Sequence, residues 1–106
     1  MTTPIYLSGQ MTGIRNHNKR AFMKAERYLR SIGIDKHDIV NPWRLSKTLR
    51  KIRKNPTYED YLDYDLMYLK HCNAIYMLPG WKNSRGANIE LCEAKRLGIK
   101  VMGSYR

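Results

Sequence analysis

The apolar residues of this chain follow two different periods. Four short, nearly continuous apolar runs are typical of strands buried on both faces, and they lie at residues 4–9, 38–41, 73–78 and 99–102. Between them the apolar positions recur every three or four residues, as on one side of an amphipathic helix. That spacing predicts three helices, over residues 18–32, 57–71 and 84–97. Strands that alternate with helices predict a small, three-layer, Rossmann-like α/β fold, in which helices flank a parallel sheet of about four strands.

The stretch 43–56 allows two interpretations. Its leucines and isoleucine have helical spacing, and six basic residues surround them: Arg44, Lys47, Arg50, Lys51, Arg53 and Lys54. A short basic amphipathic helix and an ordered loop both fit this pattern. Basic runs are usually solvated faces, so contact with nucleic acid through this stretch is the less favoured interpretation.

Length and charge limit the classes of protein that the chain can belong to. Its 106 residues fit a single domain over 1–106. The net charge is +11, from 20 Lys and Arg against 9 Asp and Glu, which indicates anionic partners such as nucleotides, nucleic acid or phosphate groups. No apolar run approaches the ~18 residues of a membrane span, and the N-terminus lacks signal-peptide features, so we expect a cytoplasmic protein with no membrane partner. Cys72 and Cys92 form no CxxC pair and are expected to be reduced, packing thiols.

Two carboxylates fall where apolar residues are expected. In the last predicted helix, Glu90 comes three residues after Ala87 and four before Ala94, within the core-facing stripe. In the preceding helix, Asp65 lies beside the stripe that contains Leu62. Burial of a carboxylate in the core costs free energy unless an opposite charge or hydrogen bonds compensate it, so a buried carboxylate has either a structural partner or a chemical function. Two of them on neighbouring helices can meet at one site, where shared burial separates their proton affinities, as chemistry on a glycosidic bond requires. The alternative is that each is the structural partner of a buried Arg, Tyr or backbone amide.

The loops at one edge of the predicted sheet contain further candidate residues. Ligands of parallel α/β sheets bind beyond the carboxyl ends of the strands, where the loops 9–16, 41–44 and 79–86 meet. Arg15 can grip a phosphate or face solvent, and Asn16 can bind the ligand or cap the first helix. Asn41 can wall the same pocket. Trp81 can stack on a base at the mouth of the crevice, or serve as a lid or a subunit contact.

No cofactor or metal ion is expected. The three histidines, His17, His37 and His71, lack the spacing of metal ligands. The sequence contains neither a P-loop nor the glycine motif of dinucleotide-binding proteins, so neither of these two kinds of nucleotide-binding site is indicated.

Three segments resemble the nucleoside 2-deoxyribosyltransferase-like superfamily. The opening Ile5-Tyr6-Leu7-Ser8-Gly9-Gln10-Met11-Thr12-Gly13 resembles its first strand and loop. Asp65-Leu66, before a strand, resembles the position of its base- or sugar-side aspartate. Ser84-Arg85-Gly86-Ala87-Asn88-Ile89-Glu90, followed by Ala94 and Leu97-Gly98, resembles the segment that carries its catalytic glutamate. The resemblance covers nearly the whole chain and is greatest to the small phage members of the superfamily, which is related to 2′-deoxynucleoside 5′-phosphate N-hydrolases.

The resemblance implies roles for these residues. Glu90 would attack the anomeric carbon of a 2-deoxyribosyl group and release the base, and water or a second base would resolve the intermediate. Asp65 would hydrogen-bond the sugar or orient Glu90, and Tyr6 would lie in the pocket floor. Ser84, with the adjacent helix amides, would bind a 5′-phosphate. The remaining substrate contacts implied are Ser8, Gly9, Gln10 and Gly86.

These observations favour an N-glycosidase that acts on 2′-deoxynucleoside 5′-monophosphates, with a deoxyribosyltransferase as a related interpretation. Gln10 stands where the family often has proline, and Arg85 where the transferases are commonly small or acidic. The chain ends at Arg106, so we expect little of the C-terminal extension that completes a neighbour's pocket in longer relatives. The alternatives are a protein that sequesters a nucleotide without cleaving it, and a basic protein that contacts nucleic acid. A homo-oligomer is expected, with Ile89 as a candidate contact.

Overall fold

A single parallel sheet forms the centre of the molecule. The computed structural model describes residues 3–104. Its four strands stand in the order β2-β1-β3-β4, and all neighbours are parallel. They are β1 (Ile5–Ser8), β2 (Ile39–Val40), β3 (Ala74–Met77) and β4 (Lys100–Gly103). The Rossmann-like α/β fold predicted from the alternating periods is therefore confirmed.

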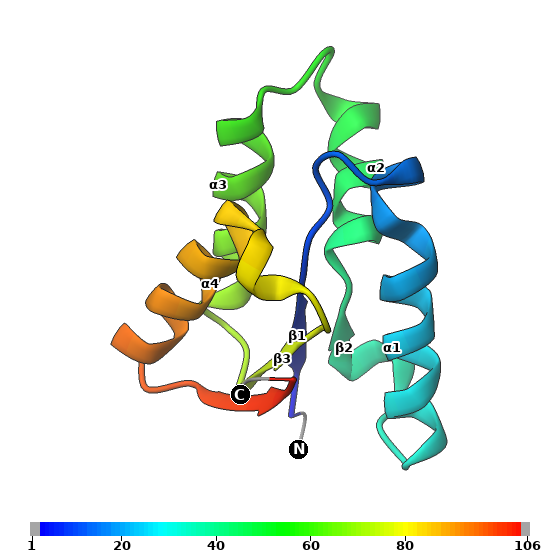
Figure 1. Ribbon diagram of the computed structural model, residues 1–106, viewed down its shortest axis with the longest axis vertical. Helices are drawn as coiled ribbons and strands as arrows, with labels where there is room; N and C mark the ends of the chain where they lie inside the picture. Colours follow the sequence, from blue (N-terminus) through cyan, green and yellow to red (C-terminus); the bar gives the residue numbers. More distant parts are fainter. Residues whose placement is uncertain (1–2, 105–106) are drawn as a thin grey trace.

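Helices cover both faces of the sheet (Figure 1). On one side lies α1 (Lys19–Ser31), and on the other lie α3 (Tyr58–Leu69) and α4 (Arg85–Arg96). The fourth helix, α2 (Pro42–Ile52), follows β2 and packs against both α1 and α3. Alternate side chains of a strand point to opposite faces, so Leu7 packs in the core under α1 while Tyr6 packs in the core under α3 and α4.

The predicted ends of the helices and strands lie close to those observed, and the ambiguous stretch is a helix. Asn41 begins α2 by accepting a hydrogen bond from the backbone amide of Trp43 at 3.0 Å, and Pro42 follows at the first helical position, where its missing amide hydrogen costs nothing. The loop interpretation of 43–56 is wrong up to Ile52. The sequence did not predict three short 3₁₀ turns: η1 (Arg15–Asn18), η2 (Lys36–Asp38) and η3 (Trp81–Asn83).

A capping box is present at the start of α3, and it supports a first prediction. The hydroxyl of Thr57 accepts from the Asp60 amide at 3.1 Å, and the Asp60 carboxylate accepts from the Thr57 amide at 2.8 Å. Because Thr57→Ala leaves one orphan amide of α3 without this acceptor, we expect it to lower the free energy of unfolding by about 1 kcal/mol. Urea unfolding followed by circular dichroism measures this. Thr48→Ala, at an exposed position inside α2, is the control, and equal midpoints for the two variants would contradict the prediction.

The two cysteines lie in different surroundings. Cys72 is buried, as expected, but Cys92 is exposed on the outer side of α4, so the expectation that it packs is wrong. Both thiols are free.

Within residues 3–104, no helix combines the length and apolar character needed to cross a membrane.

Candidate functional site

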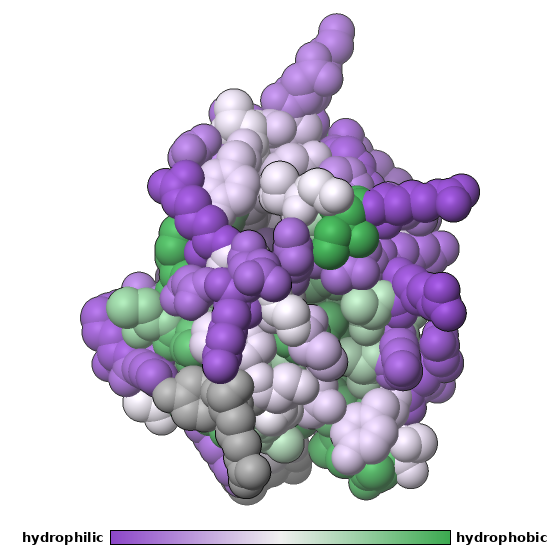
Figure 2. Space-filling model, in the orientation of Figure 1, coloured by the Kyte–Doolittle hydropathy of each residue, from purple (hydrophilic) through white to green (hydrophobic). Residues whose placement is uncertain are grey.

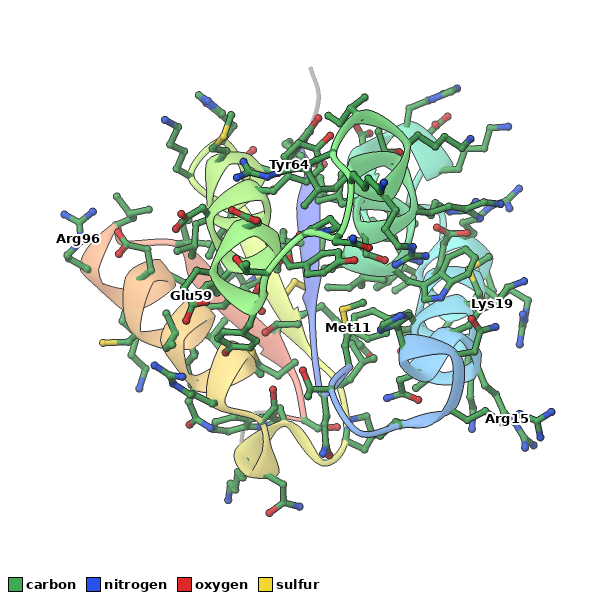
Figure 3. All side chains as sticks on the ribbon, turned by 90° about the horizontal axis from the view of Figure 1, so that it is seen from above. Met11, Arg15, Lys19, Glu59, Tyr64 and Arg96 are labelled. Atoms are coloured by element: carbon green, nitrogen blue, oxygen red, sulfur yellow. The ribbon has the colours of Figure 1, made fainter. Side chains whose placement is uncertain are left out.

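A cavity of about 700 Å³ opens at the carboxyl edge of the sheet. Its walls come from the loop after β1, the starts of α2 and α3, and the turn that leads from β3 into α4. The chain passes from β1 to β2 on one side and returns to β3 on the other, so the cavity lies at the topological switch point. Figure 3 looks down on this edge, with Met11 of the lining between the two layers of helices. This is the edge at which the sequence predicts the ligand.

Glu90 lies in the cavity wall and is held by two hydroxyl groups from β1. The side chain is buried on α4 among the apolar stripe that contains Ala87 and Ala94. Tyr6 Oη donates to Glu90 Oε2 at 2.5 Å, and Ser8 Oγ donates to Oε1 at 2.7 Å. The two donors are two residues apart on β1, so they point to the same face of the sheet. The predicted inward orientation of Glu90 is confirmed, and its carboxylate has a fixed position.

Burial raises the pKa of Glu90 to about 7, although the hydrogen bonds from Tyr6 and Ser8 favour the ionised form. Tyr6 stays a hydrogen-bond donor, because burial and the charges of Asp65 and Glu90 raise its pKa well above the ordinary value of 10.0. Glu90 therefore changes its protonation state near neutral pH while its two donors remain in place.

Asp65 shares the cavity with Glu90. It is buried on α3 and lines the same space, so its predicted inward orientation is confirmed as well. Burial, followed by the negative charge of Glu90, raises the pKa of Asp65 well above 3.8. Two coupled carboxyl groups in one buried space do not both ionise easily. Since Glu90 accepts two hydroxyl hydrogen bonds, its ionisation is the one that the surroundings favour.

The N-terminal end of α4, the helix that carries Glu90, also lines the cavity. Ser84 caps the helix by accepting from the Ala87 amide at 3.1 Å, and a serine hydroxyl in that role still has its own proton to donate. Ser84, Arg85 and Gly86 all line the cavity. A side chain at Gly86 would bring a Cβ to 3.2 Å from the hydroxyl of Tyr58, so the close approach of α4 to α3 favours glycine there.

Tyr58 of α3 is a further lining residue of the cavity. Its hydroxyl oxygen is buried and has no hydrogen-bond partner within the described part of the chain. The guanidinium of Arg85 lies over its ring, 5.4 Å from the centroid. Nothing in the local sequence distinguishes Tyr58 from the other tyrosines of α3, since its position depends on how α3 meets α4.

Three further predicted contacts, Gly9, Gln10 and Asn16, line the cavity. At Gly9 a Cβ would lie 2.9 Å from the Cβ of Leu78, so packing between β1 and the end of β3 excludes a larger residue. Asn16 does not cap α1, because the N-cap position belongs to Asn18. Ser8 lies behind Glu90, to which it donates.

The other three predicted contacts lie away from the cavity lining. Arg15 is exposed, and its side chain extends outward from the molecule (Figure 3). Asn41 is buried and caps α2. Trp81 is buried in the core beneath α4, and its indole donates to the backbone oxygen of Ser104 at 2.5 Å. The predicted position of Trp81 at the mouth of the crevice is wrong, because η3 turns the ring back toward the sheet edge.

A third buried carboxylate was missed by the sequence reasoning. Glu26 of α1 binds Arg44 of α2 in a bidentate ion pair, with N–O distances of 3.0 and 2.8 Å, and Asn41 Nδ2 also donates to it at 3.3 Å. These hydrogen bonds, of which that from Arg44 is the largest influence, lower the pKa of Glu26. The charge of Glu26 is thus satisfied within the protein. Among the described residues no group of three or more His, Cys, Asp or Glu could hold a metal ion.

The fold and this geometry define a class of protein: a small Rossmann-like α/β domain with two buried carboxyl groups that line one cavity at the switch point of its sheet. The chain belongs to the family described as "Domain of unknown function (DUF4406)", whose model matches residues 3–103. No curated protein and no solved structure gives a significant match to the chain. The family match covers nearly the same residues as the fold and assigns no activity to them.

Proposed function

We propose that this protein is an N-glycosidase that cleaves the bond between base and deoxyribose in 2′-deoxynucleoside 5′-monophosphates, with Glu90 as nucleophile. The observation that carries the proposal is the Glu90 carboxylate, held by Tyr6 and Ser8 in the wall of a cavity of about 700 Å³. That volume is within the range of about 300–1,000 Å³ for small-molecule sites. The resemblance of segments 5–13 and 84–90 to the deoxyribosyltransferase-like superfamily supports the same chemistry.

The two carboxyl groups have different roles in this reaction. An oxygen of ionised Glu90 forms a bond to the anomeric carbon, the bond from that carbon to the base nitrogen breaks, and its electron pair leaves with the base. Each carboxylate oxygen has two lone pairs, so one remains after the bond from Tyr6 or Ser8. Asp65, protonated, donates a hydrogen bond to the sugar or the departing base. Water then cleaves the glycosyl ester: its hydroxyl bonds to the anomeric carbon, its proton balances the charge of the departed base, and the carboxylate is restored.

The N-terminal end of α4 suits the phosphate of the substrate. The first amides of α4 point toward the end of the helix where anions bind favourably, and Ser84, which accepts from the Ala87 amide there, still has a hydroxyl proton to donate. The guanidinium of Arg85 adds a positive charge beside them. These groups favour a nucleotide over an uncharged nucleoside.

Incubation with each of the four deoxynucleoside monophosphates, followed by chromatography for free base, tests the proposal. We expect base release from at least one of them, and less from the matching deoxynucleoside or ribonucleotide. Formation of a new nucleotide when a second base is added would indicate a transferase. Tight calorimetric binding, with the nucleotide recovered intact, would instead indicate a protein that sequesters its ligand.

The pH dependence of base release follows from the two carboxyl groups. Since Glu90 must be ionised and its pKa is raised to about 7, we expect kcat/KM to rise with pH through the region near 7. At higher pH the rate falls as Asp65, whose pKa is also raised, loses its proton. Initial rates across the pH range measure this, and Asp65→Asn should remove the alkaline decrease. A profile that is flat through neutral pH would contradict the assignment.

A further inference from the structure

The positive charge of this protein is concentrated in one part of the chain. Residues 15–54 contain 13 of the 20 Lys and Arg but 3 of the 9 Asp and Glu, so they carry a net charge of +10 out of +11. This segment includes η1, α1 and α2. The rest of the chain, with α3, α4 and three of the strands, is nearly neutral. Most of the net positive charge is therefore carried by the part of the chain that contains the two adjacent helices α1 and α2.

The cations form two stripes on the solvent sides of these helices. Exposed residues three or four apart share a face of α1 and of α2, and the stripes are Arg20, Lys24 and Arg27 on α1, and Arg44, Lys47 and Lys51 on α2. Each stripe is about 10 Å long, from a rise of about 1.5 Å per residue. Because α1 packs against α2, the two stripes lie on neighbouring helices, and we call them together the α1–α2 basic face. Figures 2 and 3 show hydrophilic, nitrogen-tipped side chains projecting along the side of the molecule that α1 forms.

Contacts beneath the stripes fix the two helices relative to one another. The bidentate pair between Glu26 and Arg44 joins α1 to α2. The buried ring of Trp43 lies between them, with the ammonium groups of Lys19 and Lys47 at 4.8 and 5.8 Å from its centroid. Of the basic residues in segment 15–54 that the structure describes, Arg44 and Arg53 alone form ion pairs. The remaining cations are therefore available to an external anion.

We propose that the α1–α2 basic face binds the sugar–phosphate backbone of double-helical nucleic acid. Closely spaced phosphates match a surface of regularly spaced cations, of which all but Arg44 are unpaired, and such binding needs no contact with bases. A lipid membrane fits less well, because the apolar sides of both helices are buried in the core, and membrane-binding helices insert that side. A single strand fits less well too, because the exposed ring on α1, Tyr28, packs beside Tyr76 and Trp43 is buried, so no aromatic platform for stacked bases is present on the described surface of this face.

This surface function is independent of the proposed glycosidase activity, and fluorescence anisotropy with a labelled DNA duplex of about 20 base pairs tests it. We expect wild type to bind at about 100 mM KCl, with a slope of log K against log salt of about −4. The triple variant Lys24→Gln, Arg27→Gln, Lys51→Gln removes three unpaired cations of the face. We expect it to weaken binding about 10-fold or more and to reduce the slope by about 3.

The matched control is Lys70→Gln, Lys82→Gln, Lys100→Gln, which removes the same charge from exposed positions outside the face. It should retain affinity within about 3-fold. Equal losses in the two triple variants would overturn the proposal, because they would show a net-charge effect. So would tighter binding to a single strand of the same length, or binding to phosphatidylserine vesicles but not to the duplex. Glu90→Gln should bind the duplex normally, and the triple face variant should keep any base release, so the two proposals can fail separately.

Discussion

Glu90→Gln is expected to reduce the rate of base release from deoxynucleotides by at least about 10³-fold. The substitution keeps the size and the burial of the side chain but replaces the nucleophilic oxygen pair with an amide. An amide cannot form the glycosyl ester, and its nitrogen cannot accept the hydrogen bond that Tyr6 or Ser8 donates. Chromatographic measurement of the free base at saturating substrate gives kcat directly.

The matched control for this prediction is Glu93→Gln. Glu93 lies one turn further along α4, where it pairs with Arg96 and takes no part in the cavity lining. We expect its kcat to remain within about 2-fold of wild type, since exposed pairs of this kind contribute little. Unchanged base release by folded Glu90→Gln would show that Glu90 is not the nucleophile, and the glycosidase mechanism proposed for this cavity would then be wrong.

The sequence analysis singled out Glu90 and Asp65 and missed Glu26, and periodicity alone does not separate a carboxylate that serves chemistry from one that serves structure. Glu26 comes four residues after Phe22 and three before Leu29, so it has the same relation to the stripe of α1 as Glu90 has to that of α4. The two glutamates differ in the groups that contact their carboxylates. Glu26 meets the guanidinium of Arg44, whereas Glu90 meets neutral hydroxyl groups and a second carboxyl group. Arg44 is one of six basic residues in its stretch, so the sequence does not identify which of them reaches α1.

The parts of the fold that were predictable depend on regular local patterns. The continuous apolar run of β1 and the helical spacing over residues 84–97 are examples, and both elements are present. The ambiguous stretch became a helix because Asn41 and Pro42 act as a cap and first residue, a pattern that also resembles the end of a strand. The orientation of Trp81 depends on η3 and on the backbone of Ser104, which is 23 residues away, so no local pattern contains it.

At pH 8, Glu90→Gln is expected to be more stable than wild type, although it is inactive. In the unfolded chain the pKa of Glu90 is near 4.5, and in the folded protein burial raises it to about 7. Between these two values the folded state holds more protons than the unfolded state, so stability falls as pH rises through this window. Above about pH 7 Glu90 is ionised in both states. The buried charge in the folded protein then lowers the free energy of unfolding by about 3 kcal/mol at most. Below pH 4.5 this cost disappears.

Glutamine is neutral at every pH, so it avoids the cost of the buried charge. Because the amide cannot accept from both Tyr6 and Ser8 as the carboxylate does, we expect a net gain of about 2 kcal/mol at pH 8. For a domain of this size the gain corresponds to a rise of about 10 °C in Tm. Calorimetry at pH 8 and at pH 5 measures it, and the difference from wild type should be small at pH 5. Glu93→Gln, at a partly exposed position, should show no such dependence on pH. A lower Tm for Glu90→Gln than for wild type at pH 8 would mean that the two hydroxyl groups compensate the buried charge fully, and that Glu90 is ionised well below neutral pH.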